Sequence, residues 1–117
     1  SVPLHAYAPA KAAVVAITEC LAAEWGPHGI RVNAISPGHT STPALESAIE
    51  AMERDPVLLN KNALGRMVKP EEIAKAAAFL ISDDAAAITG INLPVDCGWL
   101  VSTSWDTYGG LRKASSR

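Results

Sequence analysis

Tyr7 and Lys11 stand four residues apart in the stretch HAYAPAK, and their types and spacing could perform acid–base chemistry. On a helix, residues four apart lie on the same side, which brings the lysine ammonium group within reach of the phenol. A positive charge near a tyrosine favours the phenolate form, so the hydroxyl could give a proton to a carbonyl oxygen or take one from an alcohol. A purely structural alternative is a core tyrosine ring beside a lysine that extends to water.

The pair lies at the start of an alanine-rich segment that predicts a helix over residues 6–25, ended by GPHG. Pro9 is expected in the first turn, where the missing N–H of proline is tolerated, so that the helix begins at the pair. At about 100° per residue, the pair heads a stripe that we expect to pack inward, while small residues opposite could accept a second helix. The stripe continues through Val14, Thr18, Leu21 and Trp25, and the opposite side holds Ala12, Ala16, Cys20 and Ala23.

The remaining segments predict an alternation of strands and helices. Residues 30–36 and 91–96 have the β-branched, apolar character of strands, the second weakened by Pro94. Residues 43–54 and 70–82 have helical spacing of apolar residues, and the latter opens with proline and two glutamates. Long crossovers between the strands indicate a parallel sheet with helices on its faces. Two strands are too few for such a sheet, so we expect part of a larger α/β fold.

Composition narrows the possible functions. With 117 residues, 49% of them hydrophobic and 19% charged, the chain has the balance of one small globular domain. A net charge of −2 without a dense basic cluster argues against nucleic acid and anionic lipid, and favours a small-molecule or protein partner. Cys20 and Cys97 form no C-x-x-C pair and no histidine stands at zinc-ligand spacing, so no metal site is expected. The sequence shows neither a run of about 18 apolar residues nor a signal-peptide pattern, so we expect no membrane span and a cytoplasmic protein.

Three stretches of the chain follow one another in the order AYAPAK, LAAEWGPHGIRVNAISPGHTSTP and GRMVKPEEIAKAAAFLISDDAAAITGINLPVDCGW. Together they closely resemble the C-terminal half of the short-chain dehydrogenase/reductase family. The similarity covers residues 1 to about 100. The resemblance implies an α/β fold: the C-terminal part of a Rossmann-like doubly wound parallel sheet, ordered helix-strand-helix-helix-strand and incomplete on its own. Residues 1–117 would then be half of a single NAD(P)-binding domain.

The resemblance also implies a site. Tyr7 matches the family's catalytic tyrosine, and Lys11 matches the lysine that activates it and binds the nicotinamide ribose. Both residues would then contact the cofactor. The loop PGHTSTP would contact NAD or NADP through Pro37, Gly38, Thr40 and Thr42. Residues 43–64 correspond to the segment that closes over substrate, a small-molecule alcohol or carbonyl compound. The candidate substrate contacts at this lid are His39, Leu45, Ile49 and Met52.

Other parts of the family pattern are missing from this sequence. It contains no G-x-x-x-G-x-G phosphate loop, no selector between NAD and NADP, and no catalytic serine ahead of Tyr7. We therefore expect little activity from 117 residues alone.

One hypothesis is the catalytic half of an oxidoreductase that moves hydride between NAD(P) and a secondary alcohol or ketone. Its alternative is a non-catalytic remnant that acts as an oligomerisation or interaction module. The expected assembly is a homodimer or homotetramer through the 6–25 helix, the 70–82 helix and the tail, residues 98–117.

Overall fold

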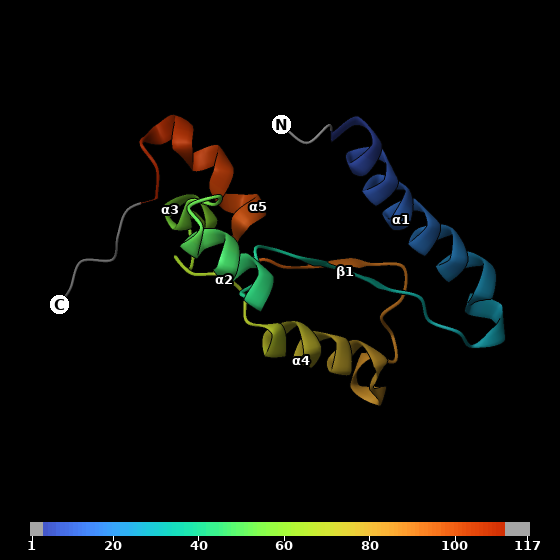
Figure 1. Ribbon diagram of the computed structural model, residues 1–117. Helices are drawn as coiled ribbons and strands as arrows, with labels where there is room; N and C mark the ends of the chain where they lie inside the picture. Colours follow the sequence, from blue (N-terminus) through green and yellow to red (C-terminus); the bar gives the residue numbers. More distant parts are fainter. Residues whose placement is uncertain (1–3, 112–117) are drawn as a thin grey trace. The chain divides into compact units, whose positions relative to one another are not determined.

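The computed structural model describes residues 4–111 (Figure 1), and so the last part of the predicted tail, residues 112–117, lies outside the described residues. The chain divides into two compact units. The first comprises the chain up to Ser36 together with Lys75–Pro94, and the second comprises Pro37–Ala74 together with the chain from Val95 onward. Each unit is described separately below.

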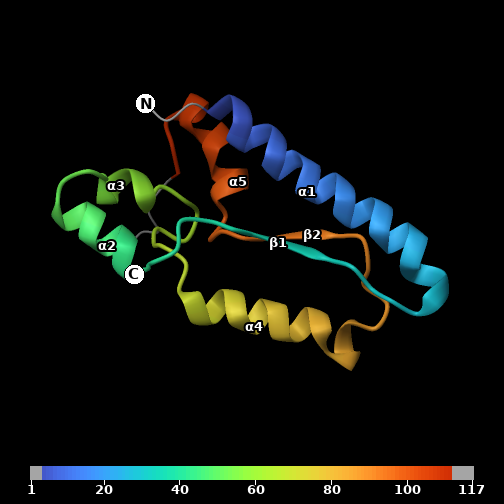
Figure 2. The same ribbon diagram turned by 45° about the vertical axis from the view of Figure 1, so that its right-hand side comes forward.

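The first unit contains the predicted strands and the two long helices. Helix α1 (Leu4–Trp25) and most of helix α4 (Pro70–Ile81) lie on opposite sides of the strand pair formed by β1 (Ala34–Pro37) and β2 (Asn92–Val95), as Figure 2 shows. A short 3-10 helix, Gly26–His28, follows α1, and Gly29 closes it in the left-handed conformation with φ 74°. The GPHG terminator was therefore predicted correctly.

The two strands pair in parallel. Ala34 N–H donates to the carbonyl of Ile91 at 2.8 Å, and Gly38 N–H donates to the carbonyl of Val95 at 2.9 Å, so the pairing advances in the same direction on both strands. Pro94 is exposed within β2 and is tolerated because β1 is the only strand paired with β2 among the described residues. The α/β class and the partial parallel sheet expected from the sequence are both present.

Arg31 ties α4 to the segments around it in the first unit. Its guanidinium group donates to the carbonyl oxygens of Leu80 at 2.7 Å, Ile88 at 3.1 Å and Ser82 at 3.3 Å. A cation at the C-terminal end of a helix satisfies carbonyl groups that have no partner within the helix. The side-chain amide of Asn33 donates to the same Ile88 carbonyl at 3.0 Å. These hydrogen bonds hold the segment just before β1 against the C-terminal end of α4 and the segment before β2.

The second unit is built from short helices and loops around a small core. Thr40 forms an isolated parallel bridge with Val68, which is 1% exposed. The helices of this unit are α2 (Pro43–Glu50), α3 (Pro56–Leu59), α5 (Trp99–Ser102) and a 3-10 helix, Thr103–Tyr108. The sequence predicted α2, although ending later, and did not predict α3 or the two helices that follow Gly98.

Two expectations for α1 were wrong. The helix begins at Leu4, before the Tyr7–Lys11 pair, so Pro9 lies inside it and cannot donate to the carbonyl of His5. The predicted inward stripe is buried only in part: Thr18 is 7% exposed, whereas Val14 is 52% exposed. The small residues opposite the stripe are also exposed, and Ala22 is buried instead, 3.3 Å from where a side chain on Gly90 would stand. Burial follows the segment that packs on α1, not the helical period alone.

Helix α1 also bears on the expectation of no membrane span. By length and composition the stretch His5–His28, with mean hydropathy 1.3, is long and apolar enough to cross a bilayer, and it is the one such helix among the described residues. A helix that packs on a sheet passes the same test, and this one carries Lys11, Glu19 and Glu24. The finding is weak evidence, and we propose no membrane role from it.

Candidate active site

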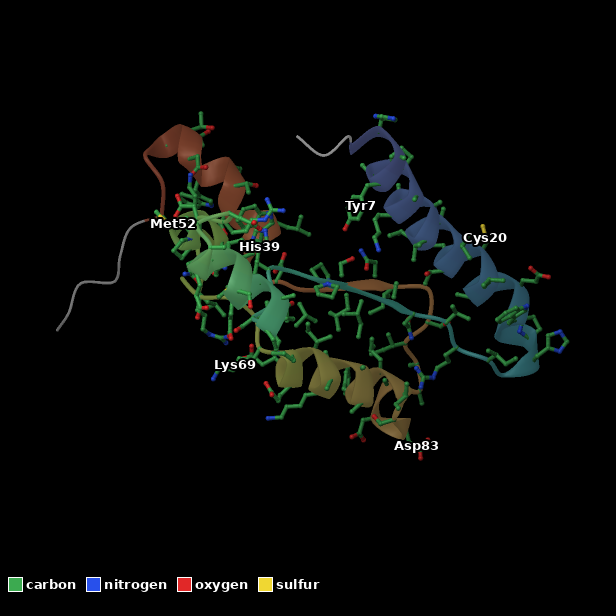
Figure 3. The ribbon with its side chains drawn as sticks, in the orientation of Figure 1. Tyr7, Cys20, His39, Met52, Lys69 and Asp83 are labelled. Atoms are coloured by element: carbon green, nitrogen blue, oxygen red, sulfur yellow. The ribbon has the colours of Figure 1, made fainter. Side chains whose placement is uncertain are left out.

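Tyr7 and Lys11 meet on α1 as their spacing predicts. The lysine Nζ lies over the tyrosine ring, 5.5 Å from its centroid, a cation–π arrangement. The Tyr7 side chain projects from α1 (Figure 3). It is 60% exposed, and Lys11 is exposed as well. Neither side chain has a hydrogen-bond partner among the described residues. The phenol is thus reachable from solvent and has a positive charge beside it, which suits a group that exchanges protons with a ligand.

The loop predicted to hold the cofactor follows β1 in the second unit and is fixed by β-type hydrogen bonds. Val68 N–H donates to the carbonyl of His39 at 2.8 Å, and Ser41 N–H donates to the carbonyl of Val68 at 2.9 Å. In such a strand-like segment, the N–H and C=O of Thr40, which stands between His39 and Ser41, point away from Val68. No backbone hydrogen bond involves Thr40 within the described part of the chain. Its N–H and C=O can therefore meet one acceptor and one donor, the pair that a carboxamide offers.

The hydroxyl groups of this loop have local partners. Thr40 donates its hydroxyl to the carbonyl of Gly38 at 2.9 Å, so toward a ligand the Thr40 oxygen can still accept. Thr42 accepts from Leu45 N–H at 3.3 Å and caps the N-terminus of α2, which leaves its own proton free to donate. The sequence predicted a cofactor contact for Thr42 but missed this capping role, which a Thr-Pro start to a helix could have signalled.

Gly38 brings the loop after β1 against the loop after β2. A Cβ at Gly38 would stand 2.7 Å from the Cα of Asp96, closer than a Cβ atom comes to a non-bonded neighbour in a protein. Asp96 in turn accepts from Gly98 N–H at 2.9 Å and from Leu100 N–H at 3.1 Å, which fixes the start of α5. The carboxyl ends of adjacent parallel strands are where α/β proteins bind ligands. Asp96 and α5 are thus site-forming features that the sequence interpretation missed.

The residues predicted at the substrate lid differ in their exposure to solvent. Leu45 and Ile49 are half-buried on α2, whereas Met52 is 92% exposed (Figure 3) and has a left-handed backbone with φ 60°. Pro37 is exposed at the end of β1. Within this unit the residues from Pro37 to Thr42 form one continuous segment, and Leu45 and Ile49 lie on α2, the helix that follows it.

An ion pair between Arg66 and Glu72 fixes the turn that precedes α4 to the first turn of that helix. Glu72 accepts from both guanidinium nitrogens of Arg66, at 2.8 and 2.7 Å, and from the backbone N–H of Lys69 at 2.9 Å. The hydrogen bonds from Arg66 are the largest cause that lowers the pKa of Glu72 to about 2, and they also raise the pKa of Arg66. Asn62, which is 7% exposed, accepts from Gly65 N–H at 2.9 Å and orders the turn before the pair.

A hollow of about 580 Å³ in the first unit holds none of the predicted site residues. It is lined by Val32, Ile35 and Leu80 among others. The one cation on its wall, Arg31, already binds three carbonyl groups. No group of three or more potential metal ligands occurs among residues 4–111.

Comparison with known proteins identifies the protein family. A family model described as enoyl-(acyl carrier protein) reductase matches residues 2–100. An uncharacterized short-chain type dehydrogenase/reductase of Sinorhizobium fredii is 42% identical over 113 residues, 96% of this chain and 20% of the relative. Galactitol 2-dehydrogenase of Rhizobium johnstonii is 44% identical over 103 residues, 88% of this chain and 39% of the relative. The chain belongs to the short-chain dehydrogenase/reductase family.

Solved structures agree on the fold. A crystal structure named as ribose-5-phosphate isomerase from Brucella melitensis 16M has a TM-score of 0.87 and 55% identity, over 97% of this chain and 44% of that one. A putative 2-deoxy-D-gluconate 3-dehydrogenase from Agrobacterium tumefaciens, with bound NADP, has a TM-score of 0.74 and 41% identity, over 81% of this chain and 39% of that one. The chain spans less than half the length of each of these relatives and neighbours.

Proposed function

We propose that this chain supplies the catalytic half of an NAD(P)-dependent oxidoreductase that interconverts a secondary alcohol and a ketone. The observation that carries the proposal is the meeting of Tyr7 and Lys11 on one helix, with the ammonium group 5.5 Å from the ring centroid, in a chain of this family. The relatives that span it are longer, so the phosphate loop and the remaining catalytic groups would come from another part of the protein. Cytoplasmic location is part of the same proposal.

Tyr7 would exchange the proton of the reacting oxygen. In alcohol oxidation its phenolate takes the hydroxyl proton, and in ketone reduction its hydroxyl returns that proton to the carbonyl oxygen. Lys11, whose ammonium group lies 5.5 Å from the Tyr7 ring centroid, would bind the ribose of the nicotinamide. A bound nicotinamide would accept or supply the hydride at the substrate carbon. The backbone of Thr40 and the hydroxyl of Thr42 would hold the carboxamide end of NAD or NADP, since both have hydrogen-bonding capacity that the fold leaves free.

The substrate would lie beside the loop after β1, with His39, Leu45, Ile49 and Met52 as its candidate contacts. The names of the similar proteins include a galactitol dehydrogenase, a putative deoxygluconate dehydrogenase and a ribose-5-phosphate isomerase. All three names point to carbohydrate-derived compounds. Hexitols, sugar acids and ribose 5-phosphate therefore belong in the first substrate panel, beside apolar secondary alcohols. The direction of the reaction stays open.

Self-association is also proposed, as a homodimer or homotetramer through α1, α4 and the segment from residue 98. Several apolar side chains on these elements are exposed in the single chain: Ile17 on α1, Phe79 and Ile81 on α4, and Trp105. Exposed apolar surface of this extent commonly marks an interface. The alternative function, an interaction module without catalysis, would use the same surfaces.

Substitution of Tyr7 by phenylalanine tests the catalytic role. In the complete protein, Tyr7→Phe should reduce kcat by about 10²- to 10⁴-fold, because proton transfer by a positioned side chain contributes on that order. The affinity for NAD or NADP, measured by fluorescence titration, should stay near that of the parent.

The matched control is Tyr108→Phe, the other tyrosine of the chain, which lies on the 3-10 helix Thr103–Tyr108. It should keep full turnover. A Tyr7→Phe protein with undiminished kcat would show that the roles are assigned wrongly. A parent without any nicotinamide-linked turnover across the panel would favour the interaction module.

A further inference from the structure

His39 and Trp99 form an aromatic contact between the two loops that follow the paired strands. Their ring centroids lie 4.7 Å apart with an interplanar angle of 78°, an edge-to-face arrangement. The contact depends on Gly38, because only a residue without Cβ allows the loop after β1 to approach Asp96 this closely. The side chains next to that backbone contact, one from each loop, then come together at the carboxyl ends of β1 and β2.

Trp99 is fixed independently of any ligand. It is the first residue of α5, and its N–H donates to the carbonyl of Asp96 at 3.0 Å, while the Asp96 carboxylate binds the N–H groups on either side of it. Gly98 stands at φ 80° with no room for a side chain, since a Cβ there would lie 2.6 Å from that of Ala63. Ser102 also donates its hydroxyl to the Gly98 carbonyl. The indole is therefore half-buried on a rigid base.

His39 has a fixed backbone and unused nitrogens. Its carbonyl accepts from Val68 N–H, and its side chain is half-buried. No hydrogen bond to the imidazole occurs within residues 4–111, and the ring's aromatic contact there is with Trp99. A neutral imidazole offers one donor and one acceptor, which is also what an alcohol hydroxyl offers. An apolar substrate would leave both nitrogens without a partner.

We propose that Trp99 is a positioning residue that holds the His39 imidazole, and that the imidazole binds a hydroxyl of the substrate other than the one that reacts. The protein would thereby select polyhydroxylated substrates over simple secondary alcohols. This inference rests on the proposed function and names the substrate class for it. Trp99 restricts the imidazole to one orientation, so the hydrogen bond to the hydroxyl forms without first ordering a free ring.

The kinetic experiment uses the complete protein with a hexitol and with cyclohexanol. His39→Phe keeps an aromatic ring against Trp99 and removes both nitrogens, so the KM for the hexitol should rise about 3- to 10-fold, the effect of one or two lost hydrogen bonds. The KM for NAD(P) should stay near that of the parent, and the KM for cyclohexanol should rise clearly less than the KM for the hexitol. Equal losses on both alcohols, or no loss on the hexitol, would overturn the inference.

Double substitution tests whether Trp99 acts through His39. Trp99→Leu should raise the hexitol KM like His39→Phe, Trp99→Phe should restore it, and Trp99→Leu in the His39→Phe background should add little. A purely structural role for Trp99 predicts additive losses instead, and additive losses would refute the positioning role.

A spectroscopic measurement separates this inference from the proposed function. The indole ring current should shift the imidazole proton resonances of His39 in the complete protein, and Trp99→Leu should remove the shift while Trp25→Phe should not. An unshifted His39 signal would overturn the positioning role whatever the activity. If neither alcohol is oxidised, the proposed function has failed, and a hexitol that leaves the His39 resonances unchanged then overturns the hydroxyl-binding role too.

Discussion

Gly38 occupies a position where space, not backbone angle, excludes a side chain. The nearest atoms to a Cβ there are the Cα and Cβ of Asp96, at 2.7 and 2.9 Å, and the first of these belongs to the backbone and cannot rotate away. The contact joins the segments that carry His39 and Trp99. Its loss would therefore disturb both the stability of the second unit and the arrangement of the site.

We predict that Gly38→Ala lowers the free energy of unfolding by about 1–3 kcal/mol, as overpacking of a close contact does. Gly26→Ala is the matched control, because nothing lies within 4 Å of the Cβ it would introduce. Its effect should stay within about 0.5 kcal/mol. Denaturant titration of the complete protein measures both, and equal stabilities of the two variants would contradict the close contact.

Cys97 adopts a left-handed backbone with φ 53°, although it has a side chain. This conformation costs an L-residue about 1–2 kcal/mol, and glycine avoids most of it. We predict that Cys97→Gly raises the free energy of unfolding by up to about 1 kcal/mol, whereas Cys97→Val lowers it. Thermal unfolding followed by circular dichroism checks the sign of each change.

The matched control for Cys97 is Cys20, the other cysteine of the chain, which lies in α1 with a helical backbone. Cys20→Gly should be destabilising, because glycine inside a helix loses more conformational freedom on folding. If Cys97→Gly were destabilising by as much as Cys20→Gly, the strain at Cys97 would not exist.

At the scale of elements, α4 depends on the ion pair at its start. Glu72 binds both the Arg66 guanidinium group and the Lys69 N–H, so one carboxylate caps the helix and anchors the preceding turn. Arg31 satisfies carbonyl groups at the other end, around Leu80 and Ser82. Both ends of the helix are thus fixed by side chains, in keeping with the hydrogen-bonding needs of helix termini.

The lowered pKa of Glu72 predicts a pH dependence of stability. Because the folded pKa is about 2 and the ordinary value is 4.5, the carboxylate stabilises the fold fully above about pH 4.5, and this contribution is lost as the pH falls toward 2. Glu72→Gln should therefore be less stable than the parent at pH 7, and the difference should shrink between pH 4.5 and 2.

The measurement is denaturant unfolding across this pH range, with Glu71→Gln as the control. Glu71 is the exposed neighbour in the first turn of α4 and has no side-chain hydrogen bond within the described residues. Its substitution should leave the pH profile nearly parallel to that of the parent. A difference between Glu72→Gln and the parent that is constant down to pH 2 would contradict the assigned role.

At the scale of the whole molecule, a large share of the apolar surface stays exposed. On α1 and α4 the side chains of Val14, Ile17, Phe79 and Ile81 are all exposed, and the sheet between these helices has two strands within residues 4–111. Parallel sheets are normally covered on both faces and continued by further strands. The matched relatives are more than twice as long as this chain, which is consistent with a shared core that 117 residues do not complete.

The absence of a Gly-rich phosphate loop from the sequence gives a binding prediction. Millimolar NAD or NADP should not raise the Tm of the 117-residue chain measurably, because the pyrophosphate has no helix N-terminus of that type to bind. The complete protein should show a saturable shift. A clear, saturable shift for the 117-residue chain would show that it has a phosphate site of its own.

The sequence alone determined the local features. Tyr7 meets Lys11, α1 stops at GPHG and α4 begins at Pro70 because each depends on residues within one or two helical turns. The family pattern likewise follows from local motifs. Where the sequence reasoning erred on α1, it placed Pro9 in the first turn and assumed that the helical period decides which face is buried.

The tertiary structure decided the contacts between distant segments. Three contacts join positions about 50 or 60 apart in the chain. They are the approach of Gly38 to Asp96, the ring contact of His39 with Trp99, and the hydrogen bonds from Arg31 to the carbonyl groups near residue 80. The type of a single residue does not predict such contacts, because each contact depends on the direction in which two loops continue from the paired strands and on the space between neighbouring residues. The residues of the candidate site could therefore be named from the sequence, whereas the ring that positions His39 appeared only once the strands were paired.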